Sequence, residues 1–185
     1  EVITQLAEAK QLTVRIAYNL FTQKPKEELA DFKHWTSTVK LHQGDDFLRH
    51  NGVGEMLTFS AADFEDFLEP RPDLPPGMEQ DLEPVVRHLV EHRWPFRLHA
   101  TYDESISRML DVFEKVNRDI PFGGIPWFFD HCETISPKNI ERVKALGGGI
   151  AIQDRMAFQG EYFVDRYGKR AAEATPPIKR MLAEG

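Results

Sequence analysis

Two histidines lie at the ends of apolar, β-rich segments, where their ring nitrogens could bind a metal ion or exchange protons. His99 lies near the end of the run WPFRLHA, and His131 ends the aromatic run GIPWFFDH. A carboxylate, Glu55, lies in a third apolar stretch, NGVGEMLTF. Imidazole nitrogens and carboxylate oxygens are common zinc ligands in proteins. The two imidazoles therefore favour a metal site made by His99 and His131, whereas a carboxylate beside two glycines, such as Glu55, is more often simply exposed.

The prediction depends on the two histidine segments being neighbouring strands. Side chains alternate along a strand, so His99 is expected to share a face with Arg97, and His131 with Phe129 and Trp127. Neighbouring strands lie about 5 Å apart, which brings two imidazoles at equivalent strand ends within reach of one cation.

Other interpretations of these residues remain open. A single histidine at a strand end is more often a hydrogen-bonded structural residue, and two histidines can act as acid and base without a metal. Asp130 either orients a neighbouring ligand or contacts a helix on the outer side, and Cys132 is expected to be a packed thiol. The remaining histidines are predicted to lie on helix surfaces or in loops: His34, His42, His50, His88 and His92.

Hydrophobic periodicity predicts the elements that must position these side chains. Strands are expected over 12–20, 51–59, 94–100, 124–131 and 147–153, and helices over 25–41, 81–90, 101–116, 137–146 and 175–185. Thr101 and Glu104 are predicted to form a capping box, and Ser136 to cap the helix that starts at Pro137. Strands that alternate with helices predict a parallel α/β sheet with right-handed crossovers. Periodicity leaves open whether that sheet is doubly wound or an arc of an eight-stranded barrel.

Composition limits the classes of partner. The 185 residues include 23 Lys and Arg against 30 Asp and Glu, a net charge of −7, and they contain no basic run and no glycine-rich phosphate loop. No nucleic acid partner is therefore expected. No stretch reaches the roughly 18 apolar residues of a spanning helix, and the first residues lack a signal-peptide pattern, so we expect no membrane association and a cytoplasmic location. The single cysteine excludes an internal disulfide.

Two longer segments resemble a known family. The stretch RLHATYDESISRMLDVFEKV is similar to the strand-five segment of the amidohydrolase superfamily, specifically its amidohydrolase 3 group, which includes N-substituted formamide deformylases. The stretch FFDHCETISPKNIERVKALGGGIAIQ resembles the strand-six and strand-seven segment, and the resemblance extends over essentially the whole chain. It implies a partial TIM-type (β/α) barrel with a divalent metal, zinc, in which His99 and His131 are the histidine ligands of strands five and six. Glu55 lies where many relatives carry a carboxylated lysine, and we expect it to serve as a carboxylate ligand instead.

The resemblance also implies what this chain lacks. Relatives begin with an HxH pair on strand one and end with a general-base aspartate on strand eight, which is expected beyond residue 185 here. Because the chain does not begin with methionine, we interpret residues 1–185 as one domain, an internal fragment covering about strands three to seven of a larger catalytic barrel.

The resemblance predicts the reaction of the parent enzyme. Metal-activated water would cleave the amide-type C–N bond of a small molecule, with Arg97, Tyr102, Trp127 and Arg155 as candidate substrate-binding residues. The fragment alone is expected to hold little or no metal and to be inactive. The alternative is a non-catalytic half-barrel module that self-associates through its exposed sheet edges.

Overall fold

A computed structural model describes residues 2–64 and 66–185 of the chain. The strands are β1 (Ile16–Leu20), β2 (Leu48–Val53), β3 (Phe96–Ala100), β4 (Trp127–His131) and β5 (Gly149–Ala151). The helices are α1 (Val2–Glu8), α2 (Glu28–Thr38), α3 (Met78–Glu91), α4 (Asp103–Asp119), α5 (Pro137–Ala145), α6 (Met156–Tyr167), α7 (Lys169–Glu173) and α8 (Ile178–Glu184), with a short 3₁₀ helix, η1 (Phe59–Ala61).

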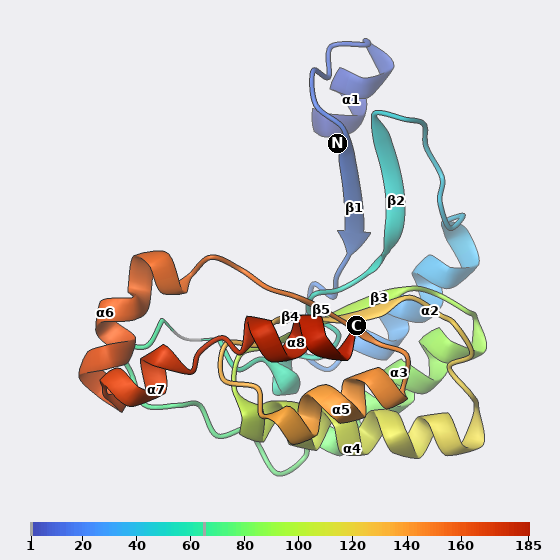
Figure 1. The fold of residues 1–185 in the computed structure, drawn as a ribbon. Coiled ribbons are helices and arrows are strands. Elements are labelled where there is room, and N and C mark those ends of the chain that lie inside the picture. Colours follow the sequence, from blue (N-terminus) through green and yellow to red (C-terminus); the bar gives the residue numbers. More distant parts are fainter. Residues whose placement is uncertain (1, 65) are drawn as a thin grey trace.

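The strands form one parallel sheet in the order β1-β2-β3-β4-β5, which confirms the predicted α/β class. Each strand lies beside the next one in the chain, without the reversal of order that defines a doubly wound sheet. The sheet therefore resembles an arc of a barrel. Figure 1 shows α3, α4 and α5 side by side along one face of the sheet, with β1 and β2 projecting as a pair away from them.

The core between the sheet and α4 is aromatic. Phe113 of α4 packs edge-on against Phe96 and Trp127, with ring centroids 5.6 and 5.1 Å away, and stacks on Phe129 at 5.5 Å. All four side chains are buried, and edge-to-face and offset contacts are the favoured geometries of aromatic rings. A Cβ on Gly148 would lie 2.1 Å from the Trp127 ring, so this packing requires glycine there.

The bounds of the second strand and the exposure of His50 were predicted wrongly. We expected residues 51–59, but β2 ends at Val53 and the chain leaves the sheet before η1. The prediction that His50 lies on a surface is wrong, because it is a fully buried residue of β2. Its ring packs beside Trp94, and its Nε2–H donates to the carbonyl oxygen of Gly52 at 2.9 Å.

The predicted capping box of α4 is absent from the structure. Glu104 forms an ion pair with Arg71 instead, with a shortest distance of 2.6 Å. The backbone N–H groups of Thr101 and Tyr102, just before the helix, donate to the carboxylate of Asp63 at 3.0–3.1 Å. A distant carboxylate thus replaces the local cap.

Helix ends elsewhere agree better with the sequence. The Ser136 side chain accepts from the N–H of Asn139 and Pro137 is the first residue of α5, as predicted. The last helix starts at Ile178 rather than near Thr175, and α1, α6 and α7 were not predicted. Among residues 2–64 and 66–185, none of the helices combines the length and apolar character needed to cross a membrane.

Candidate metal centre

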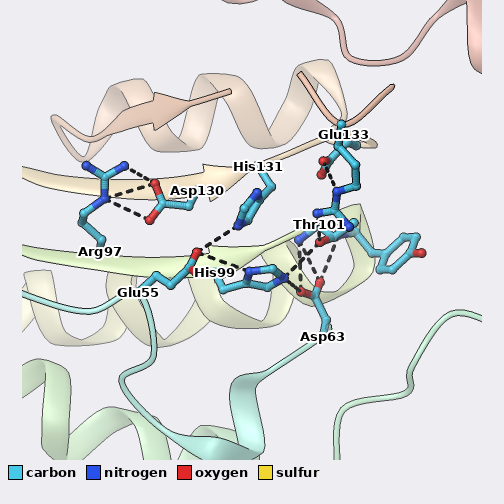
Figure 2. A network of polar contacts seen from close by, with 10 residues as sticks. Glu55, Asp63, Arg97, His99, Thr101, Asp130, His131 and Glu133 are labelled. Atoms are coloured by element: carbon cyan, nitrogen blue, oxygen red, sulfur yellow. Dashed lines mark hydrogen bonds and ion pairs between the residues drawn. The ribbon is translucent and has the colours of Figure 1, made fainter. Parts of the chain in front are cut away.

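The carboxyl ends of β2, β3 and β4 bring Glu55, His99 and His131 together, as expected (Figure 2). Oε2 of Glu55 lies 2.9 Å from Nε2 of His131 and 3.4 Å from Nδ1 of His99. The two imidazole centroids are 4.3 Å apart. One possible ligand atom from each residue lies within 4.8 Å of the others, a span that one cation can occupy.

His131 reaches this cluster through an unusual backbone. The β3–β4 register places Trp127 and Phe129 on the buried face with Phe96, so alternation alone would turn His131 to the same side. His131 and Cys132 have φ angles of +80° and +56°, in the left-handed region that few non-glycine residues adopt. Figure 2 shows the His131 ring pointing at Glu55 instead. The prediction that His131 shares a face with Trp127 is therefore wrong.

The protons around His99 favour a cation between the three residues. Both oxygens of Asp63 accept backbone N–H groups, and Nε2 of His99 lies 3.3 Å from Oδ1 of Asp63 and 3.2 Å from the hydroxyl oxygen of Thr101, so either oxygen can accept a hydrogen from Nε2. With the hydrogen on Nε2, Nδ1 of the neutral ring carries a lone pair that faces the Glu55 carboxylate. A lone pair facing a carboxylate oxygen needs a positive species between them. The donor set therefore fits a divalent cation.

The pKa shifts of Glu55 and His131 also favour a cation-binding site. The hydrogen bond from His131 is the largest cause that holds the pKa of Glu55 well below its usual range, so this carboxylate is charged at neutral pH. Burial lowers the pKa of His131, but the hydrogen bond and the negative charge of Glu55 outweigh burial and raise this pKa overall. The Glu55 carboxylate and the His131 ring thus stabilise opposite charges on each other.

Asp63 is a candidate functional residue that the sequence analysis missed. It is fully buried and joins His99 to the start of α4, as Figure 2 shows. It lies in an irregular acidic stretch, AADFED, 36 positions before His99, and no local spacing links the two. Only the tertiary structure reveals that it orients a candidate ligand.

Two of the four predicted substrate-binding residues border cavities beside the candidate metal centre. Arg155 borders a cavity of about 1020 Å³ that is also lined by Glu55, His99 and His131, and its Nε lies 2.9 Å from the buried carboxylate of Glu133. Arg97 borders a second cavity, of about 700 Å³. Its Nε donates to both carboxylate oxygens of Asp130, at 2.9 and 3.1 Å. Asp130 therefore holds Arg97 and performs neither of the roles considered from the sequence.

The other two predicted substrate-binding residues are in the core and line neither cavity. Tyr102 packs against Phe67. Trp127 lies at the amino end of β4, where its Nε1–H donates to the carbonyl oxygen of Leu146 at 3.2 Å. Burial explains both residues without a substrate.

Comparison with protein families agrees with this geometry. The model of the amidohydrolase family, in its third group, matches residues 1–185. This chain belongs to the amidohydrolase family. A search of curated proteins gives no match for this amidohydrolase.

Two solved structures share the fold. An uncharacterized metal-dependent hydrolase from Pyrococcus furiosus superposes with a TM-score of 0.67 at 18% identity, over 97% of this chain and 37% of that one. A second, from Pyrococcus horikoshii, gives 0.64 at 16% identity, over 97% and 36%. The amidohydrolase chain thus spans about a third of the length of either structure.

Proposed function

We propose that this amidohydrolase chain is part of a metal-dependent hydrolase that cleaves an amide-type C–N bond in a small molecule. The observation that carries the proposal is the convergence of Glu55 on His99 and His131, with the other nitrogen of His99 lying 3.3 Å from a carboxylate oxygen of Asp63. A divalent cation at this point, zinc by its donor set, would lower the pKa of a bound water and polarise the substrate carbonyl. The two Pyrococcus proteins are metal-dependent hydrolases, which supports this class of reaction.

The residues of this chain have separate roles in the proposal. Glu55 supplies negative charge, and the two imidazoles supply neutral nitrogen ligands. Phe64 and Phe158 line the larger cavity with Arg155, so the substrate would meet apolar surface and one cationic side chain. We propose that the base that accepts the proton of the attacking water lies outside residues 1–185.

We further propose that residues 1–185 are an internal part of one catalytic barrel and do not hydrolyse substrate alone. The chain covers 37% of the Pyrococcus furiosus structure, so most of a comparable barrel would come from other residues. Three protein ligands also leave coordination positions to be filled. The isolated chain would consequently bind metal weakly.

A half-barrel module that self-associates is the second candidate. Within the described part of the chain, β5 pairs with β4 alone, and the apolar side chains of Ile150, Met181 and Leu182 line a groove of about 690 Å³ beside it. Unpaired strand edges favour association with another strand. Two copies of this chain could cover that edge.

Metal removal tests the hydrolase proposal. The complete protein that contains this chain should contain zinc by elemental analysis and hydrolyse members of a panel of N-substituted amides. Dialysis against a chelator should remove the activity, and added zinc should restore it. Full activity in the metal-free protein would instead favour histidine acid–base chemistry. The 185-residue chain alone should show no hydrolysis, and light scattering will show whether it forms dimers.

Asp63→Asn tests the orientation of His99. The backbone N–H groups of Thr101 and Tyr102 need the amide oxygen, so the amide NH₂ would face Nε2 of His99 and move the ring hydrogen to Nδ1. We expect the zinc affinity of the complete protein to fall about 10- to 100-fold, the usual effect of losing a group that orients a ligand.

Competition with a chromophoric chelator measures this change in affinity. Asp66→Asn is the matched control, because Asp66 lies on the same loop and accepts only from the N–H of Leu68 among the described contacts. Equal zinc affinities for the two variants would refute the role of Asp63.

A further inference from the structure

A second group of side chains of metal-ligand types lies at the carboxyl end of α3. His88, Glu91 and His92 each offer a ligand atom, and these atoms lie within 4.8 Å of one another. The two imidazole centroids are 4.1 Å apart. The group precedes the amino end of β3, whereas His99 lies near its carboxyl end, so the length of the strand separates it from the first site.

The hydrogen atoms of His92 can be assigned from one contact. Its Nδ1 lies 2.8 Å from the backbone carbonyl oxygen of His88. A carbonyl only accepts, so Nδ1 carries the hydrogen. In the neutral ring Nε2 consequently keeps its lone pair for a ligand.

A contact with Thr36 of α2 assigns the hydrogen of His88 to the other ring nitrogen, Nε2. Its Nε2 lies 2.8 Å from the hydroxyl oxygen of Thr36. That hydroxyl donates its one hydrogen within its own helix, with the carbonyl oxygen of Phe32 nearest at 2.9 Å. The hydroxyl oxygen therefore accepts from His88 Nε2–H, and Nδ1 of His88 keeps the lone pair. Each ring has one nitrogen committed to the protein and one available.

The position on the helix favours a cation. The residues H-L-V-E-H place two imidazoles four positions apart on one face, the spacing used by zinc-binding helices. Glu91 and His92 are exposed at the carboxyl end of α3, where the helix dipole favours positive charge. The two cavities at the first site are lined by other residues, so this group is suited to binding rather than catalysis.

We propose that His88 Nδ1, His92 Nε2 and the Glu91 carboxylate form a second, peripheral site for a divalent transition metal. Two imidazoles and a carboxylate suit zinc, and also nickel and copper. Water would complete the coordination. The hydrogen bond from His88 to Thr36 would orient the first ligand.

Zinc titration of the complete protein tests the site. The background is His99→Ala/His131→Ala, so failure of the hydrolase proposal leaves this result unaffected. We expect this background to bind one zinc equivalent, and addition of His92→Ala to lower its affinity at least about tenfold. Thr36→Val should weaken binding without removing a ligand. His34→Ala is the control, because His34 is exposed on α2 and outside the group.

Selective ¹⁵N-histidine spectra provide a second readout without metal. They should show His88 with its hydrogen on Nε2 and His92 with its hydrogen on Nδ1. Unchanged zinc binding in the His92→Ala variant, no zinc binding in the background, or the opposite ring forms would each overturn the proposal. Because the site lies away from the cavity, His92→Ala in the otherwise unaltered protein should leave hydrolysis unchanged.

Discussion

His131→Ala in the complete protein is expected to abolish zinc binding at the first site and to lower kcat/KM at least about 10³-fold. A metal ion contributes several kcal/mol to stabilising the transition state of such reactions, and each 1.4 kcal/mol is a factor of ten. His131 makes the shortest contact with Glu55, at 2.9 Å, and its loss leaves only Glu55 and His99 of the three candidate ligands. Elemental analysis and steady-state kinetics on the same preparation measure both effects.

Two further variants sharpen this test. Glu55→Gln keeps the side-chain shape and removes the charge, so it should weaken zinc binding without disturbing the fold. His42→Ala should leave metal content and kinetics unchanged, because His42 is exposed and outside both histidine groups. Normal zinc content together with normal kcat/KM in His131→Ala would contradict the proposed metal centre.

Trp127→Ala is expected to lower the free energy of unfolding by about 3–5 kcal/mol, the usual cost of truncating a buried aromatic side chain. Trp127 is 1% exposed and lies among the rings of Phe96, Phe113 and Phe129. Its removal would leave a cavity beside Gly148, which packs against the Trp127 ring. Denaturant titration measures the change.

Phe128→Ala is the matched control on the same strand. Phe128 points to the other face of β4 and is 37% exposed, so its truncation should cost clearly less. In Trp127→Ala, the zinc affinity of the folded fraction should stay normal. A large loss of substrate affinity with unchanged stability would restore the substrate-binding role predicted from the sequence.

Local patterns predicted the parts of this structure that depend on neighbouring residues. The Ser136–Pro137 start of α5 is a property of a few consecutive residues, and so is the apolar stripe of α4. His99 was correctly placed at the end of a strand because an uninterrupted apolar run precedes it. The parallel sheet places His99 and His131 at neighbouring strand ends, although the left-handed backbone at His131 is what turns its ring toward His99.

The predictions that proved wrong depend on long-range contacts or on backbone geometry that sequence patterns do not show. The capping of α4 by Asp63 joins positions 38 residues apart, and sequence spacing contains no information about such a contact. The left-handed turn at His131 breaks the alternation on which its predicted face depended. Trp127 was a substrate-binding candidate because it lies on the strand that ends at His131, although its position early in the strand places it in the core.

The pairing between β2 and β3 divides the sheet into two parts. These strands share one register pair, Val53 with Phe96, whereas β1–β2 and β3–β4 each pair at five positions. Glu55 follows β2 on one side of this weak junction, and both histidines lie on the other side. A cation held by all three residues would therefore cross-link the two parts. Metal uptake would then also be an assembly step, and the metal-free sheet should exchange its amide hydrogens fastest along this junction.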